Sequence, residues 1–378
     1  IMFIFVWYSD RYNKMECKKL LTYFADMKDP KIERTKRHLM DDILFISIAA
    51  VLSGVESWDE MEEYGKKKQP WLETLLSLPN GIPSHDTFNR FFAALDPDEF
   101  EDRFLKWVKT LCESTDGEII SIDGKTIRGS RGQGCKTATH IVSAWADKNE
   151  LILGQVKVEH KSNEITAIPR LLDALLLKGS IVTIDAMGCQ KTIAKQIVKK
   201  QADYVLSVKD NQQELLEDIR DSYSILPAND YYEYVDYDHG RIETRKCSIL
   251  TDLSLVFSSN KWPKLNSIVK MERERYFKAT GKSESETQYY ISTLSDARLI
   301  EKCIRKHWGI ENKVHWILDV AFNEDMSRKR DGNAAQNFSS LNRIAINLLR
   351  KSELKIGVKS RRKICGWDND YLLKILTN

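Results

Sequence analysis

The 378-residue sequence lacks the features that mark several classes of protein. Its seven cysteines are scattered and form no C-x-x-C pair, which argues against a disulfide framework or a zinc knuckle and favours a reducing cytoplasm. No hydrophobic run reaches the length that spans a bilayer, so we expect no association with a membrane. The net charge is only +3, so a surface that binds nucleic acid must be local.

The chain begins with a short apolar segment, Ile1 to Tyr8. Eight residues are too few to span a bilayer, and the segment has neither the basic region nor the cleavage site of a secretory signal. Met15 is a candidate start of translation. We therefore expect residues 1–15 to be a non-native leader.

Residues 16–115 predict a helical N-terminal domain. The sequence Asp96-Pro-Asp-Glu99 combines a capping Asp, Pro at the first helical position and Glu at the third, which indicates a helix start. Two helices joined by the turn at 78–83 can form a DNA-binding motif of helix-turn-helix type, with the helix at 84–95 as the recognition helix. An ordinary helical bundle fits the pattern at least as well.

Two apolar, strand-like runs end on carboxylates, Asp123 in the run 118–125 and Asp185 in the run 180–186. An unpaired carboxylate is costly inside a buried strand, so we expect each strand to meet a cleft at its Asp. Adjacent strands lie about 4.8 Å apart, and two such carboxylates can converge on a metal pair whose ions lie about 3.5–4 Å apart. A turn cap is the alternative role for either residue.

The elements predicted from residue 118 to residue 208 follow the order β-β-β-α-β-α-β. An antiparallel meander followed by parallel crossovers is the order of an RNase H-like core, a mixed five-stranded sheet with helices. This topology places the strands of Asp123 and Asp185 side by side. The chain then becomes strand-rich from about residue 231 to 294 and ends in helices.

A third carboxylate is expected from the helix predicted over 298–321, because Mg²⁺ prefers hard oxygen ligands. Glu311 lies in the middle of this helix and shares a face with His307 and His315. These three residues can also be interpreted as a zinc site, although the H-E-x-x-H spacing is absent. The competing acids Asp319, Glu324 and Asp325 are expected to point away or to pair with arginines.

Seven ordered motifs together resemble the DDE transposases of bacterial insertion sequences, and more narrowly the H-repeat-associated branch. The resemblance spans roughly residues 20–350. The motifs are GIPSHDTF at 81–88, DGKTIR at 123–128, KSNEI at 161–165, TIDAMG at 183–188, DHGRIETR at 238–245, YYISTL at 289–294 and HWGIENKVHWILDVAFNED at 307–325.

The resemblance implies that Asp123, Asp185 and Glu311 are the catalytic, metal-binding residues, with Mg²⁺ as the cofactor and Mn²⁺ as a substitute. It also implies an RNase H-like core interrupted by a β-rich insertion. We accordingly divide the chain after the N-terminal domain into a first core segment (116–211), the insertion (212–295), a second core segment (296–349) and a basic C-terminal tail (350–378). The expected partner is double-stranded DNA, both transposon ends and target, bound by a homodimer.

Basic and polar residues near these motifs are candidate DNA contacts, with a solvated surface or a stabilised hairpin as the alternative. Many related transposases carry Tyr, Arg and Lys at the positions of Ile304, His307 and Leu318, so their phosphate contacts cannot be transferred to this chain. The candidates are Lys125, Arg128, Arg131, Lys209, Asn211, His239, Arg241, Arg305 and Lys313.

The sequence therefore predicts an enzyme that cuts DNA at the ends of an insertion sequence and joins the ends to a target. Two alternatives stay open. One is a plain nuclease with an RNase H-like fold, and the other is a DNA-binding relic of a transposase that has lost catalysis.

Overall fold

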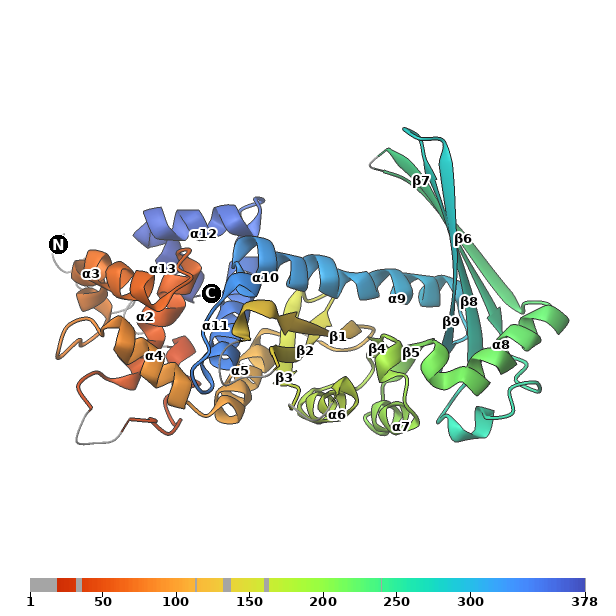
Figure 1. Cartoon of the computed structure of the whole chain (residues 1–378), viewed down its shortest axis with the longest axis horizontal. Coiled ribbons are helices and arrows are strands. Elements are labelled where there is room, and N and C mark those ends of the chain that lie inside the picture. The colour runs from red at the N-terminus through yellow and green to blue at the C-terminus, as the bar shows by residue number, and fades with distance from the viewer. Residues whose placement is uncertain are drawn as a thin grey trace, which may run out of the picture.

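The computed structural model describes residues 19–31, 36–112, 114–131, 137–159, 163–238 and 240–377. The predicted leader (1–15) and His239 lie outside these residues. A helical body holds the N-terminal and C-terminal helices, a central region is built on a sheet, and a ribbon of long strands projects at the far end (Figure 1). Among the described helices, none is long and apolar enough to cross a membrane.

The central region has the strand order predicted for an RNase H-like core. β1 pairs antiparallel with β2, β2 antiparallel with β3, and β1, β4 and β5 run parallel to one another. Helices α6 and α7 lie on one side of these strands and α9 on the other (Figure 1). The bounds are β1 Ile119–Ile127, β2 Thr139–Ala146, β3 Leu151–Lys157, α6 Glu164–Ala174, β4 Ile181–Ile184, α7 Lys191–Lys199 and β5 Asp203–Val208.

The strands of the predicted insertion extend the core sheet and do not form a sheet of their own. β9 pairs antiparallel with β5, which gives one sheet in the order β3-β2-β1-β4-β5-β9-β8-β7-β6. We call β6–β9 the strand ribbon; its outer portion stands clear of the body (Figure 1). The bounds are α8 Gln213–Ile225, β6 Asp230–Asp238, β7 Arg241–Leu250, β8 Ser267–Phe277 and β9 Lys282–Ser292.

The helix predicted over 298–321 contains an irregular turn. It consists of α9 (Ala297–Ile310), a π-helical turn (Glu311–His315) and α10 (Trp316–Ala321). A π-helical turn is rare and is found frequently at functional sites. This helix runs across the sheet from the ribbon to the helical body (Figure 1).

One N-terminal helix begins at its predicted start signal, Asp96. Ser57 and Glu60 form a capping box at the start of α3, and the Asp96 carboxylate accepts hydrogen bonds from two backbone N–H groups at the start of α5. The long helix α11 packs against α2, α4, α5 and β3, and almost every residue on it is buried. The bounds are α2 Met40–Leu52, α3 Trp58–Leu75, α4 His85–Ala94, α5 Pro97–Leu111 and α11 Ala334–Arg350.

The segment expected to be a basic C-terminal tail (350–378) contains two helices. Its helices α12 (Val358–Trp367) and α13 (Asn369–Thr377) pack against α2 and α11. The reason is visible at Arg362, which is only 3% exposed and donates hydrogen bonds to the carbonyl oxygens of Val51 and Ala321. The N-terminal helices therefore share one core with the C-terminal end of the chain.

Candidate active site

The parallel pairing of β1 and β4 places the two predicted aspartates on adjacent strands. The last paired residues are Ile122 and Ile184, so Asp123 and Asp185 come next on the two strands. β4 ends there, whereas β1 continues to Ile127 through its pairing with β2. The sequence predicted that Asp123 ends its strand. In the structure Asp123 lies within β1, and it still lines a cleft.

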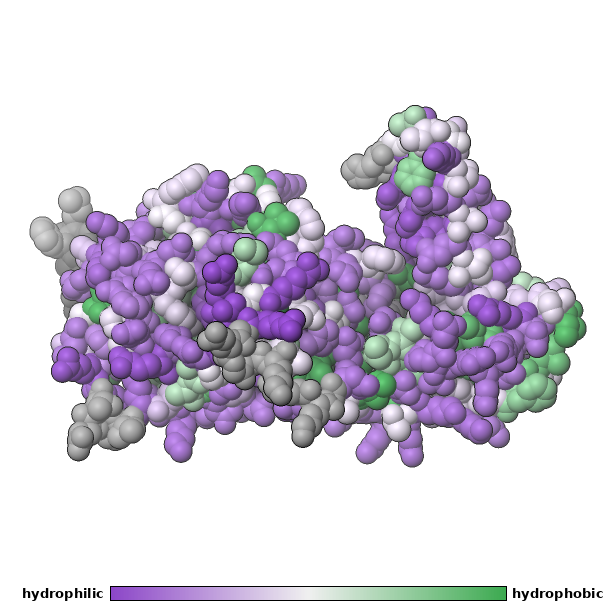
Figure 2. Space-filling view, viewed as in Figure 1, coloured by the Kyte–Doolittle hydropathy of each residue, from purple (hydrophilic) through white to green (hydrophobic). Residues whose placement is uncertain are grey.

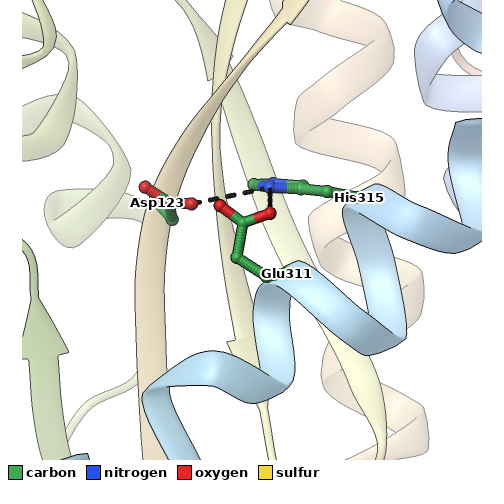
Figure 3. A group of neighbouring side chains, drawn as sticks. All are labelled: Asp123, Glu311 and His315. Atoms are coloured by element: carbon green, nitrogen blue, oxygen red, sulfur yellow. Dashed lines mark ion pairs between the residues drawn. The ribbon is translucent and has the colours of Figure 1, made fainter. Parts of the chain in front are cut away.

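Glu311 reaches the same place from the π-helical turn (Figure 3). Its Oε2 lies 3.3 Å from Nδ1 of His315, and the same nitrogen lies 3.5 Å from Oδ2 of Asp123. Ligand atoms of the three side chains all lie within 4.8 Å of one another. Glu311 is half-exposed on its cleft side, so it does not have the apolar surroundings that were expected for it.

Burial and mutual repulsion perturb the two facing carboxyl groups. Burial, together with the nearby Glu311, raises the pKa of Asp123 to about 8. The hydrogen bond from His315 lowers the pKa of Glu311 to about 2. Without a cation the pair therefore favours holding one proton, as is usual for carboxylates that share a site.

Asp185 follows the neighbouring strand β4 and is fixed by its own turn. One of its carboxylate oxygens accepts hydrogen bonds from the backbone N–H groups of Met187 and Gly188. Burial raises the pKa of Asp185, and Glu164 raises it further, whereas Lys209 lowers it. Asp123, Asp185 and Glu311 line one cleft of about 220 Å³, and Lys209 is also in its wall.

The two histidines near Glu311 have separate roles, so the alternative zinc site with three ligands on one helix face is not assembled. Nδ1 of His307 lies 3.0 Å from the hydroxyl of Thr183, and burial lowers the pKa of His307 to about 4. His315 was predicted to share a face with Glu311, and the structure places it beside both Glu311 and Asp123. Its Nε2 is buried without a hydrogen-bond partner among the described residues.

The site residues fit a divalent cation on chemical grounds. The raised pKa of Asp123, whose carboxyl group is held beside that of Glu311, indicates an excess of negative charge in the absence of a cation. Three carboxylates in one cleft supply the hard oxygen ligands that Mg²⁺ and Mn²⁺ prefer. The imidazole of His315 is a nitrogen ligand that Mn²⁺ accepts more readily than Mg²⁺.

The acids that compete with Glu311 are already engaged elsewhere. Asp319 and Asp325 both pair with Lys125, at 2.7 and 2.8 Å. Glu324 is buried and pairs with the fully buried Arg343 at 3.3 Å. Lys125 is only 7% exposed and held between two carboxylates, so the structure does not support the DNA contact predicted for it.

The other predicted DNA contacts are dispersed. Arg128 and Arg131 are exposed beside the end of β1. Arg305 pairs with Asp236 at 3.0 Å, and Lys313 pairs with Glu150 at 2.8 Å. The Asn211 side chain donates to the carbonyl oxygen of Ala186 and braces the turn after Asp185, so its role in the structure is in positioning. Arg241 lies in a cavity beside the cleft.

A hydrogen-bonded pair behind β1 was not predicted. Nε2 of His140 lies 2.7 Å from Oε1 of Glu164, and a Cβ at Gly124 would collide with both side chains. The glycine directly after Asp123 was the available signal for this close approach. Trp308 and Trp316 are 49% and 60% exposed. Both tryptophans lie on the long helix that carries Glu311.

Comparisons with known proteins identify the family. A family model described as Transposase DDE domain matches residues 114–348, and one described as DDE_Tnp_1-associated matches residues 21–108. The chain is 41% identical over 374 residues to the Putative transposase YncI of Escherichia coli O157:H7, which covers 96% of both chains. It is 37% identical over 373 residues to the H repeat-associated putative transposase YhhI of Escherichia coli strain K12, covering 96% of this chain and 98% of that protein.

A shorter relative is the Inactive transposase YbfQ of Escherichia coli strain K12. It is 37% identical over 76 residues, which cover 20% of this chain and 90% of that protein. The family model matches well over half of the present chain, and the two long relatives match almost all of it. The chain therefore belongs to the family of transposases that carry a DDE domain.

Proposed function

We propose that this transposase cleaves DNA at the ends of an insertion sequence and joins the freed ends to a target, in a reaction that depends on Mg²⁺ or Mn²⁺. One observation carries the proposal: Asp123, Asp185 and Glu311 come from β1, the end of β4 and the helix α9–α10, and all three line one cleft. The cleft also contains a basic residue, Lys209.

A divalent metal pair in this cleft would activate a water or a 3′-hydroxyl and stabilise the leaving oxygen of the phosphodiester. Asp123 interacts electrostatically with both other acids, so it would hold the metal together with each of them. The N–H groups of Met187 and Gly188 orient Asp185, and His315 orients Glu311. These contacts hold the ligands in place before metal and DNA bind, which lowers the cost of assembling the site.

Double-stranded DNA is the proposed partner, bound at both transposon ends by a homodimer in the cytoplasm. Lys209 would contact the scissile phosphate, and its position in the wall of the cleft with the three acids supports this role. Arg128 and Arg131 would contact the backbone on the helical-body side of the cleft, and Arg241 and Arg305 on the ribbon side. Lys313 would first have to exchange its pairing with Glu150 for a phosphate.

Recognition of the end sequence is assigned to the helical body, with α4 as the reading helix. Its buried face is formed by Phe88, Phe91 and Phe92, which leaves Asp86 and Arg90 exposed on the other face. Because the core of this body includes α11, α12 and α13, the isolated segment 16–115 would lack a portion of its own core. Binding to the end sequence must therefore be measured with the whole chain.

The test is to incubate the protein with a duplex containing the element's end, a target plasmid and Mg²⁺, and to sequence the products. End strands joined to the target support the proposal. Nicked ends without joining would indicate a plain nuclease. A bound but intact duplex would indicate the DNA-binding relic, and no binding at all would contradict every version of the proposal.

A further inference from the structure

A second cavity, of about 280 Å³, lies where the strand ribbon meets α9. We call it the arginine pocket, because five arginines line it, two from β7, two from β8 and one from α9. The lining residues are Arg241, Glu243, Arg245, Met271, Arg273, Arg275, Glu286, Gln288, Glu301, Ile304, Arg305, Trp308 and Asn312. No catalytic role in the proposed reaction requires these arginines.

Strand register brings the arginines together on one face of the ribbon. Arg245 on β7 is directly opposite Arg273 on β8, and Glu243 is directly opposite Arg275. Residues two apart on a strand share a face, so these four residues all point into the same cavity. Like charges directly opposite each other are destabilising. The pairing of Arg245 with Arg273 therefore requires compensation by anions.

The protein supplies only some of that compensation. Glu243 is buried and contacts Arg245 at 2.9 Å and Arg275 at 3.8 Å, and Glu286 pairs with Arg273. The lining thus holds five guanidinium groups against three carboxyl groups, the third being the buried Glu301, and Arg305 also pairs with Asp236 outside the pocket. Burial raises the pKa of Glu301, whereas the nearby Arg245 and Arg305 lower it.

Two arginine nitrogens at this pocket are buried without an acceptor. Nη1 of Arg245 and Nε of Arg275 have no hydrogen-bond partner among the described residues. A buried donor left without a partner costs about 1–3 kcal/mol. Guanidinium groups bind phosphate through paired N–H donors. An incoming phosphate would therefore supply both the missing acceptors and the missing negative charge.

The arginine pocket is next to the catalytic cleft. Gln288, Ile304 and Trp308 line both cavities. The exposed ring of Trp308 stands between them, and the guanidinium carbon of Arg273 lies 5.9 Å from its centroid. In Figure 2 the ribbon stands away from the body, and its visible surface is largely hydrophilic. A DNA strand leaving the cleft toward the ribbon would pass the pocket.

We propose that the arginine pocket binds a backbone phosphate of the DNA strand whose scissile bond lies in the catalytic cleft. Arg245 and Arg273 hold the phosphate, Arg275 adds charge, and the more exposed Arg241 and Arg305 guide it at the mouth. Trp308 packs against the sugar or base between the two sites. This inference rests on the proposed function, because it assumes that the cleft receives DNA.

The test measures binding of the whole chain to a duplex containing the element's end, by fluorescence anisotropy in Ca²⁺ over a range of NaCl concentrations. Arg273→Gln and Arg245→Gln are each expected to weaken binding several-fold. Each should also reduce the salt slope by about 0.9 for every phosphate that is no longer neutralised. The matched control is Lys246→Gln, since Lys246 is next to Arg245 but on the opposite face of β7. Lys246→Gln should leave the binding affinity and the salt slope unchanged.

A second measurement locates the phosphate. Single methylphosphonates are placed along the strand on either side of the scissile bond. A methylphosphonate at one position should weaken DNA binding by the wild type and should not weaken binding by Arg273→Gln any further. Additive effects at every position, or an unchanged salt slope in all pocket variants, would overturn the inference.

Folding is monitored by thermal unfolding of each variant. If Arg245→Gln fails to fold, the test uses Arg273→Gln and Arg241→Gln. The Arg241 side chain is 42% exposed at the mouth of the pocket, so its replacement should not prevent folding. Failure of the wild type to bind the duplex would contradict the proposed function. Wild-type binding with unaffected variants would contradict only the arginine pocket.

Discussion

The carboxyl group of Asp123 is hydrogen-bonded to that of Glu311, and Nδ1 of His315 lies within 3.5 Å of both side chains. One partner lies on a central strand and the other two lie on the π-helical turn between α9 and α10. The turn places Glu311 and His315 together opposite the strand. The long helix thus completes a site that the sheet alone leaves with two aspartates.

Asp123→Asn is expected to stabilise the metal-free protein and to remove stabilisation by metal. In the wild type, burial and Glu311 make the Asp123 charge unfavourable, and an amide removes that cost. Thermal unfolding with chelator, Mg²⁺, Mn²⁺ and Ca²⁺ measures both effects. Mg²⁺ or Mn²⁺ should raise the wild-type melting temperature and leave that of the variant unchanged. An equal metal-induced rise in both proteins would place the cation elsewhere.

In cleavage assays with end DNA, Mg²⁺ and Mn²⁺ are expected to support cutting, whereas Ca²⁺ supports binding with little cutting. The reason is that Ca²⁺ takes more ligands at longer distances, so it does not hold the reacting oxygens in the same geometry. Full cleavage in excess chelator would contradict a metal-dependent site.

Glu324→Gln is expected to impair stability and not chemistry. Glu324 and Arg343 are both buried, and Ser339 donates to the Glu324 carboxylate at 2.8 Å. Removing one member of a buried ion pair leaves the other charge uncompensated and costs about 3–5 kcal/mol. Urea unfolding checks this value, with the less buried Asp325→Asn as the matched control. A fully stable Glu324→Gln protein that fails to cut DNA would assign a catalytic role to Glu324.

Glu101 is expected to make stability depend on pH. It is buried, its Oε1 accepts a hydrogen bond from the Gln155 N–H, and burial raises its pKa to about 7. A raised pKa means that the folded state binds the proton more tightly. The contribution of Glu101 to the free energy of unfolding is therefore complete below about pH 4.5 and is lost as the pH rises through about 7.

The wild type is compared with the variant Glu101→Gln, because the glutamine side chain resembles the protonated acid. The free energy of unfolding of the wild type, minus that of the variant, should fall between pH 5 and pH 8 by on the order of 3 kcal/mol. Urea titrations at several pH values measure this difference. A difference that stays constant over that range would show that Glu101 is ionised throughout.

Arg362→Gln is expected to destabilise the helical body by on the order of 3 kcal/mol, because a glutamine cannot reach all the carbonyl oxygens that the guanidinium group serves. Arg362 donates to Val51 and Val55 at the end of α2 and to Ala321 at the end of α10. The control Lys374→Gln removes only an exposed pair with Glu353 and should cost less than about 1 kcal/mol. Similar unfolding midpoints for the two variants would contradict a structural role for the C-terminal helices.

The sequence predicted the elements whose signals are local. Apolar runs that stop at Asp123 and Asp185 identified both central strands, and the order of elements identified the core topology. The segment predicted to be rich in strands, from about residue 231 to 294, contains β6 to β9. These features depend on residues that are close together in the chain, so a single sequence contains the information for them.

The features that were missed depend on contacts between distant segments. The arginine pocket exists only because β7 and β8 pair with Arg245 opposite Arg273, a register that the sequence of either strand does not specify. The burial of Arg362 depends on carbonyl groups at the ends of two other helices. Trp308 is exposed because it lines both the arginine pocket and the catalytic cleft. From the sequence alone, a tryptophan is expected to be buried.

Sequencing the products of the wild type and Glu311→Gln with end DNA, target and Mg²⁺ tests the central claim most directly. The substitution keeps the side-chain shape and removes the charge, so Glu311→Gln is expected to bind the end and to produce neither nicks nor joined strands. Asp325→Asn, and Glu324→Gln at a temperature where it is folded, should still cut. Normal cutting by Glu311→Gln together with an inactive, folded Asp325→Asn would contradict the assignment of Glu311 and place the third acid beyond the helix.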